Sequence, residues 1–347
     1  MIDAAYIARK TFFAAATTLN LRALAPKRFA GAGAILMLHR VSPDCRSPLG
    51  VHAGLCITPQ FLDELIPALK QLGHDFIAMD DLPQRLAKPT GRPFLTVTFD
   101  DGYKDNAVHA YPVLQRHNVP YTVYIAPGLT NGDTFLWWEL LEQVIWKQDT
   151  VELGSTVIDC KSMSAKRSAF FRIHRHLLHD LPETQMPSFI RDFAAKAGKD
   201  ARAYGKAELL DWTEIRKAAR DPLCTIGTHT MNHYHLARLD NAQLQSEFDM
   251  AAKALEAETG VVARHVAYPY GYDIGVGLRE TQEASRRKYV TGVTTRHGVI
   301  FGEHRSAITA LPRISVNGNH QSVSDVRLML SGLTSLLAHR HGGPVTL

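Results

Sequence analysis

Long apolar runs are missing from this sequence, and so are internal repeats and low-complexity tracts. No run reaches the ~18 residues of a transmembrane helix, so we expect no membrane-spanning segment. The formal charge of +5 is mildly basic and would suit an anionic surface or polymer. No compact Lys/Arg stripe with interleaved aromatic residues is present, however, so we expect no nucleic-acid partner.

Cysteine is also scarce, with Cys45, Cys56, Cys160 and Cys224 spread over 347 residues. None of the four belongs to a C-x-x-C pair, which argues against a zinc site built from thiolates. Four cysteines in a chain of this length do not resemble a disulfide framework. This pattern favours a reducing compartment, and we therefore predict a cytoplasmic protein, with an exported or membrane-associated one as the alternative.

The N-terminus, residues 1–30, is predicted to be a separate helical segment. Arg9 and Lys10 precede the apolar stretch 12–16, and the stretch 23–25 (Ala-Leu-Ala) resembles a signal-peptide cleavage site. Polar residues interrupt the apolar region and Pro26 would follow the cut, which argues against a cleaved signal. We favour an amphipathic helix docked on the rest of the protein or on a membrane surface.

Strand-like apolar runs alternate with helical patterns along most of the chain, which is typical of a parallel α/β fold. The hydrophobic content of 45% and the length suffice for one large α/β barrel. The strand-like runs are 34–38, 76–78, 94–99, 121–125, 224–226, 265–267, 289–293 and 311–316, and helical patterns include one from 58, 105–117, one from 212 and 241–259. We predict a barrel over residues 31–320 and a C-terminal helix and tail over 321–347.

The alternation breaks between about residues 131 and 206, which we interpret as a helical insertion on the barrel. This segment contains the pair Trp137 and Trp138, followed by several lysines and arginines between 161 and 175. The basic stretch is either a solvated helical face or a substrate-binding surface, and the sequence leaves both interpretations open.

Polar residues follow the predicted strands at the positions where catalytic groups of α/β barrels gather. They are His39, the pair Asp100 and Asp101, the pair His229 and His233, and the segment Pro269-Tyr270-Gly271. One carboxylate and two imidazoles suit Zn²⁺ or a similar divalent ion with one position left open for water. A second, adjacent acid can then act on that water. Each cluster alone could be a turn or a surface feature, but their order along the chain favours a hydrolytic site.

The amino-acid sequence of these clusters resembles that of the polysaccharide deacetylase family, which includes chitin, chitooligosaccharide and nodulation-type deacetylases. The matching stretches are 98–102 (Thr-Phe-Asp-Asp-Gly), 229–233 (His-Thr-Met-Asn-His) and 267–271 (Ala-Tyr-Pro-Tyr-Gly). The resemblance implies a distorted (β/α) barrel with fewer than eight complete units. It also implies a divalent metal and an N-acetylated glycan as substrate. Zn²⁺ is the preferred metal, and Co, Ni or Mn are alternatives.

The same resemblance implies roles for individual residues. Asp100 would be the general base, and Asp101, His229 and His233 would bind the metal. The backbone N–H of Tyr270, which follows Pro269, would stabilise the oxyanion. The roles together describe removal of acetyl groups from a polymer or oligomer of N-acetylglucosamine. A branch of exopolysaccharide deacetylases with Tyr-Pro-Tyr-Gly looks most similar.

The sequence departs from the family at two positions. The family arginine two residues before the proline is replaced by Ala267, and Arg264 should face the opposite way on a strand. The guanidinium of Arg313 could replace it by holding a carboxylate bidentately, although a surface arginine at a strand start is an equal alternative.

The second departure is a missing late Leu-x-His, which supplies the general acid in the family. His39 ends the first strand, and imidazole titrates near neutrality, so we assign it the acid role. A hydrogen bond at the barrel rim is an equal alternative for His39. Three late histidines, His297, His304 and His320, compete for the role.

Two other functions stay open. One is hydrolysis of a non-sugar amide on the same barrel, and the other is carbohydrate binding by a pseudoenzyme that has lost the usual arginine and histidine. Trp137, Trp138 and Tyr270 could stack on sugars, although for the two tryptophans we favour anchoring of the insertion. No feature of the sequence indicates an oligomeric state.

Overall fold

The computed structural model describes residues 26–339, 343–345 and 347, and six positions between 11 and 19. Most of the predicted N-terminal segment, including Arg9, Lys10 and the stretch 20–25, lies outside the described residues. Its helical character and its membrane contact therefore stay predictions. In the described part of the chain, no helix is long and apolar enough to cross a membrane.

Seven parallel strands close into a barrel in the order β1-β12-β11-β10-β9-β6-β5, and β5 pairs with β1 to complete the ring. The strands are β1 Gly33–Leu38, β5 Phe94–Phe99, β6 Tyr121–Ile125, β9 Cys224–Thr228, β10 His265–Ala267, β11 Thr291–His297 and β12 Leu311–Ser315. A short strand, β4 (Asp75–Phe76), also pairs with β5. The predicted fold class, a distorted (β/α) barrel with fewer than eight units, is confirmed.

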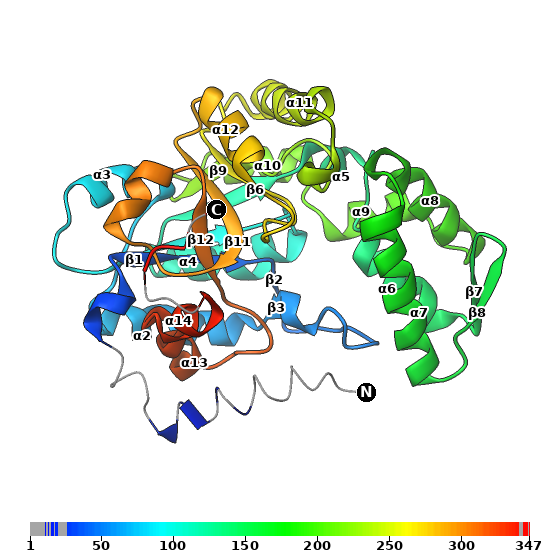
Figure 1. Cartoon of the computed structure of the whole chain (residues 1–347), viewed down its shortest axis with the longest axis horizontal. Coiled ribbons are helices and arrows are strands. Elements are labelled where there is room, and N and C mark those ends of the chain that lie inside the picture. The colour runs from blue at the N-terminus through cyan, green and yellow to red at the C-terminus, as the bar shows by residue number, and fades with distance from the viewer. Residues whose placement is uncertain are drawn as a thin grey trace.

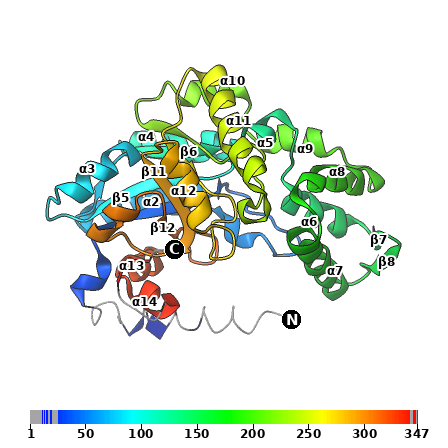
Figure 2. The ribbon, with the colours of Figure 1, turned by 45° about the horizontal axis from the view of Figure 1, so that its top comes forward.

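Helices cover the outside of the barrel (Figures 1 and 2). The longer ones are α2 Pro59–Gln71, α3 Leu82–Ala87, α4 Tyr111–Arg116 with the π-helix η5 Asn106–Ala110, α5 Pro127–Asn131, α10 Trp212–Ala218, α11 Asn241–Thr259, α12 Leu278–Arg286, α13 Val323–Leu330 and α14 Leu333–His339. Short elements are η2 Lys27–Ala30, β2 Arg40–Val41, η3 Ala53–Leu55, β3 Cys56–Ile57, η4 Met79–Asp81, η8 Leu236–Arg238 and η9 Gly302–Ala307. Local signals set the helix ends: the Thr58 side chain caps α2, and Gly260, with φ +71°, ends α11.

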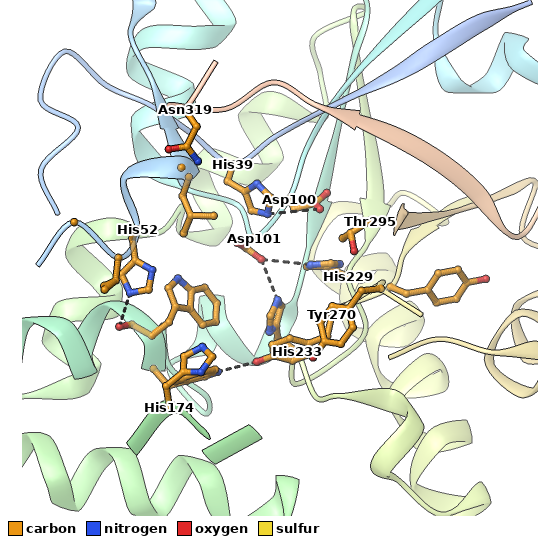
Figure 3. A pocket seen from close by; sticks show the side chains of 18 residues that line it. His39, His52, Asp100, Asp101, His174, His229, His233, Tyr270, Thr295 and Asn319 are labelled. Atoms are coloured by element: carbon orange, nitrogen blue, oxygen red, sulfur yellow. Dashed lines mark hydrogen bonds and ion pairs between the residues drawn. The ribbon is translucent and has the colours of Figure 1, made fainter. Parts of the chain in front are cut away.

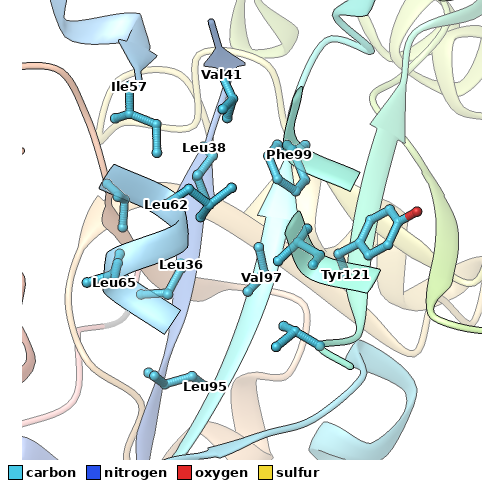
Figure 4. Packing of buried hydrophobic residues seen from close by; sticks show 14 of the residues in the cluster. Leu36, Leu38, Val41, Ile57, Leu62, Leu65, Leu95, Val97, Phe99 and Tyr121 are labelled. Carbon is cyan, nitrogen blue, oxygen red and sulfur yellow. The ribbon is translucent and has the colours of Figure 1, made fainter. Parts of the chain in front are cut away.

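The two faces of the barrel strands are both buried, because helices cover one face and the barrel interior encloses the other. In β5, the side chains of Leu95, Val97 and Phe99 point toward the helices, whereas Phe94 packs inside. Figure 4 shows Leu62 and other side chains of α2 packed against β1. Burial of each such side chain contributes about 1.5–3 kcal/mol, which holds the strand ends rigidly in place.

The insertion packs around a hydrophobic cluster of its own and projects from one side of the barrel (Figure 1). Its elements are α6 Trp137–Lys147, β7 Thr150–Leu153, β8 Thr156–Asp159, α7 Met163–Arg175, the π-helix η6 His176–Asp180, η7 Glu183–Gln185, α8 Met186–Lys196 and α9 Ala201–Glu208. The sequence analysis predicted only helices in this segment, so the antiparallel hairpin β7–β8 was not predicted. Its loop consists of Gly154, with φ +61°, and Ser155.

Cys45 and Cys56 form a disulfide, which the sequence analysis did not predict, since it found no disulfide framework. The sequence could not reveal the pairing because it depends on β2 and β3, whose pairing places Arg40 opposite Cys56. The two Cα atoms lie 5.4 Å apart, within the range that a disulfide spans. Cys160 and Cys224 are free.

Candidate active site

Asp101, His229 and His233 come together at the carboxyl ends of the barrel strands (Figure 3). Asp101 follows β5 directly, and His229 follows β9. The Nε2 atoms of His229 and His233 lie 3.4 Å and 3.1 Å from Oδ1 of Asp101. One ligand atom from each of the three side chains lies within 4.8 Å of the others, which is the spacing that a single bound cation requires.

The chemistry of these three side chains fits a divalent metal. Nδ1 of His229 lies 2.7 Å from the carbonyl oxygen of Ala267, which can only accept. Nδ1 must therefore carry the proton, and Nε2 is left with a lone pair directed at the cluster. Oδ1 of Asp101 is buried and has no hydrogen-bond partner among the described residues. A cation would satisfy this oxygen, and one carboxylate with two imidazoles is a donor set typical of Zn²⁺.

Strained backbone conformations concentrate at this site. Asp101, Thr230, His233 and Tyr270 all have positive φ, between +51° and +70°. Such angles are costly for residues other than glycine and persist only where the surrounding structure enforces them. Their clustering around three converging ligand atoms therefore points to function rather than to an ordinary turn.

Glu247 on α11 supports the loop that carries His233. Its carboxylate accepts hydrogen bonds from the backbone N–H of Asn232 at 2.8 Å and from the Asn232 side chain at 2.6 Å. The sequence analysis missed this residue. The signal was available, because Glu247 lies beside Phe248 and three residues from Leu244, on the buried side of a helical pattern.

Asp100 is buried beside the cluster and is held by Arg313 from β12. The guanidinium donates from Nη1 to Oδ1 at 2.8 Å and from Nη2 to Oδ2 at 2.6 Å. Burial by itself raises the pKa of Asp100, but the charge and hydrogen bonds of Arg313 outweigh it and keep this pKa below its usual value. Asp100 is therefore an ionised acceptor at neutral pH.

The geometry rejects the alternative of a surface arginine, since the Arg313 side chain is fully buried inside the barrel. Arg264, in contrast, is largely exposed and donates to Asp80 at 2.7 Å, away from the site. The family position itself is occupied by Ala267, whose carbonyl oxygen instead accepts the hydrogen bond from His229.

His39 also borders the site, with Nε2 4.0 Å from Oδ2 of Asp100 and about one fifth of its side chain exposed. The late histidines do not line this cavity. His297 hydrogen-bonds Thr334, and His304 hydrogen-bonds the carbonyl oxygen of Val345. His320 lies 3.5 Å from Asp325. Of the four candidates for the acid, only His39 is in place.

Tyr270 contributes its backbone N–H, which has no hydrogen-bond acceptor among the described residues. Its hydroxyl accepts a hydrogen bond from Nε1 of Trp137 at 2.7 Å, and its ring stacks on His235. Pro269, which is buried, precedes it. The insertion therefore holds the side chain of Tyr270 while its N–H stays available to a ligand.

Trp137 and Trp138 border the same cavity, but their side chains belong mainly to the buried core of the insertion, with exposed fractions of 4% and 8%. Nε1 of Trp138 donates to the hydroxyl of Tyr103 at 3.2 Å. This hydrogen bond and the one from Trp137 to Tyr270 favour the interpretation that the two tryptophans anchor the insertion over that of a sugar-stacking face.

The cavity has a volume of about 470 Å³ and is open to solvent on one side. Besides the residues above, it is lined by side chains that the sequence analysis did not single out, among them His52, His174 and Asn319. These residues carry no motif, since two lie in loops and His174 lies on α7 of the insertion.

Residues 87–287, more than half of the chain, match the polysaccharide deacetylase family. The chain belongs to the polysaccharide deacetylase family. The prediction of a hydrolase of this class is thus confirmed. Among curated proteins, none matches the sequence. The matched range contains the deacetylase motifs, whereas His39 and Arg313 lie outside it.

Several solved structures share the fold of this polysaccharide deacetylase at low sequence identity. The Streptococcus pyogenes deacetylase PplD, solved in complex with acetate, is 19% identical with a TM-score of 0.57, and the match covers 86% of this chain and 97% of that one. IcaB from Ammonifex degensii is 17% identical with a TM-score of 0.55 over 86% and 98%. A de-N-acetylase from Aggregatibacter actinomycetemcomitans is 12% identical with a TM-score of 0.52 over 85% and 98%. Identities this low establish the shared fold alone.

Proposed function

We propose that this chain is a metal-dependent enzyme that removes N-acetyl groups from a polymer or oligomer containing N-acetylglucosamine. The observation that carries the proposal is the cluster of Asp101, His229 and His233 directly beside the ionised, buried Asp100 in an open cavity. This arrangement offers three metal ligands and a separate base, which is what hydrolysis of an unactivated amide requires.

Each remaining group has a task in this reaction. A divalent cation, preferably Zn²⁺ but alternatively Co, Ni or Mn, would act as a Lewis acid that acidifies water and polarises the acetyl carbonyl. Asp100 accepts a proton from the attacking water, and the N–H of Tyr270 donates to the oxygen that gains negative charge. His39 donates a proton to the leaving nitrogen. The C–N bond breaks, acetate leaves, and a free amine remains on the sugar.

We prefer an exopolysaccharide as the substrate polymer, because the segment Tyr268-Pro269-Tyr270-Gly271 resembles that of a branch of exopolysaccharide deacetylases. Hydrolysis of a small non-sugar amide is the enzymatic rival, and a panel of small amides beside N-acetylated glycans separates the two. A pseudoenzyme is disfavoured because Asp100 is present and Asp101, His229 and His233 cluster beside it.

The decisive experiment measures acetate release from a panel of N-acetylated glycans, with and without chelator. Chelator should abolish release, and Zn²⁺ or Co²⁺ should restore it. His229→Ala should weaken metal binding, since only two protein ligands would remain. Full activity in metal-free protein would contradict the proposal.

His39→Ala should keep its metal and lose turnover by roughly 10²-fold, the lower end of the range for a lost acid–base group. We expect the lower end because His39 is partly exposed, so water can replace it in part. Turnover with saturating oligosaccharide and metal content are the measurements. Unchanged turnover would mean that His39 only forms a hydrogen bond at the rim.

The location in the cell also stays a prediction. The cytoplasmic assignment was based on the apparent lack of a disulfide framework, and the Cys45–Cys56 bond weakens that basis. Disulfides form and persist mainly in oxidising compartments. The bond therefore supports the alternative, an exported or membrane-associated enzyme, and fractionation of cells that express the tagged full chain would decide.

A further inference from the structure

His174 lies on α7 of the insertion and borders the cavity that contains the metal cluster (Figure 3). Its ring packs on Trp137, with centroids 5.3 Å apart, and on Phe170, with centroids 5.5 Å apart. Neither ring nitrogen has a hydrogen-bond partner among the described residues. An immobilised imidazole with two free nitrogens in an open cavity is available to a ligand.

His52 borders the same cavity from the loop before η3, and its ring packs edge-on against Phe170. His52 and His174 therefore contact the same side chain, Phe170, and lie close to each other. Nε2 of His52 lies 3.0 Å from the carbonyl oxygen of Trp138, which can only accept, so this nitrogen is the donor. In the neutral ring, Nδ1 then keeps a lone pair and can accept a hydrogen bond.

The lining of this cavity is poor in charge, although His52 also borders a neighbouring hollow lined by Arg40 and Arg46. Asp100 and Asp101 are the only carboxylates among the residues that line the cavity, and no lysine or arginine lines it in the described part of the chain. Burial, followed by the neighbouring His52, lowers the pKa of His174 to about 4, so this ring is neutral at physiological pH. The net charge of +5 of the whole chain does not extend into the cavity.

We propose that His52 and His174 form a second sugar subsite, which binds the hydroxyl groups of an uncharged unit next to the one being deacetylated. A neutral imidazole offers one donor and one acceptor, and a sugar hydroxyl can pair with either. The absence of lysine and arginine from the lining of this cavity disfavours uronic acid or phosphorylated units, which such cations would bind. This inference rests on the proposed function and narrows its substrate to neutral oligomers.

The test compares N-acetylglucosamine monomer, dimer and tetramer as substrates of the metal-loaded full chain. The wild-type protein should prefer the dimer and tetramer in kcat/KM. His174→Phe keeps an aromatic ring against Trp137 and Phe170 but removes both ring nitrogens. It should raise KM for the tetramer about three- to tenfold, the size of one or two lost hydrogen bonds, with a smaller change in kcat and unchanged metal content. His174→Gln should recover part of the loss.

His176→Phe is the matched control, because His176 follows in the same helical stretch but pairs with Asp180 outside the cavity. It should have the parental KM. Parental KM in His174→Phe, or equal kcat/KM for monomer and tetramer, would overturn the subsite and leave the proposed function standing.

A binding measurement separates the two proposals. The tetramer is titrated calorimetrically into Asp100→Asn protein, with and without His174→Phe. Weaker binding in the double variant supports the subsite even if no glycan releases acetate, a result that would overturn the proposed function instead. Equal binding by both proteins, or binding of a carboxylated oligomer as tight as that of the neutral one, would overturn the subsite.

Discussion

Asp100→Asn should keep its metal and lose turnover by roughly 10²–10⁴-fold, the usual contribution of a general base. The amide is nearly isosteric with the carboxylate but cannot accept the proton of the attacking water. The wild-type carboxylate accepts from Arg313 at both oxygens. The amide can keep only one of these bonds, so the folding of the variant is checked before the loss is assigned to kcat. Turnover per bound ion and metal content by elemental analysis are the measurements.

Asp101→Asn is the matched comparison, since it makes the same chemical change one residue away. Asp101 directs its buried Oδ1 at the two imidazoles, so its amide should impair metal occupancy more than turnover per bound ion. If both variants lost metal equally and had the same turnover per ion, the assignment of base and ligand would be wrong.

Arg313→Ala should both destabilise the protein and alter its pH profile. Removing one partner of a buried ion pair leaves the other charge uncompensated, which typically costs about 3–5 kcal/mol. Urea unfolding should report this loss, because the fully buried guanidinium makes two hydrogen bonds to Asp100 and one to the carbonyl oxygen of Thr294.

The direction of the pH effect follows from the pKa of Asp100. Burial raises this pKa, and Arg313 lowers it below the usual value. The ionised Asp100 therefore stabilises the fold above its unfolded pKa, and this stabilisation is lost as pH falls through the folded pKa. Without Arg313, the effect of burial, which raises the pKa of Asp100, is opposed only by the weaker effects of His229 and His39. The carboxylate base should then become protonated at higher pH, and the acidic limb of the pH–rate profile should move upward.

Arg264→Ala is the control for this experiment, because Arg264 pairs with Asp80 at the surface. It should leave both the acidic limb and the unfolding midpoint close to those of the parent. A parental pH profile in Arg313→Ala would show that the pair serves stability alone.

Most of the barrel could be predicted from the sequence because a parallel strand is buried on both faces. Stretches such as 94–99 and 121–125 are continuously apolar or β-branched, and the observed strands have these bounds. The helix predicted over 241–259 also has its predicted bounds, since Asp240 caps its start and Gly260 ends it. The hairpin β7–β8 was missed, although Gly154-Ser155 between two short runs is a known hairpin signal.

The convergence of Asp100, Asp101 and His229 could be predicted because these residues come at the ends of strands. Carboxyl ends of parallel strands meet on one face of a barrel, so Asp101, His229 and the adjacent Asp100 come together whatever the loops do. Strand order along the chain and residue chemistry were sufficient to bring these residues together, whereas their separate roles as base and metal ligands came from the resemblance and stay predictions.

Contacts between distant segments were decided only by the tertiary structure. Arg313 reaches Asp100 because β12 pairs with β1, and β1 pairs with β5, inside a closed barrel. The Cys45–Cys56 bond depends on the pairing of β2 with β3. His174 borders the cavity because α7 of the insertion lies beside it. None of these approaches has a local sequence signal, since each depends on register and packing across many intervening residues.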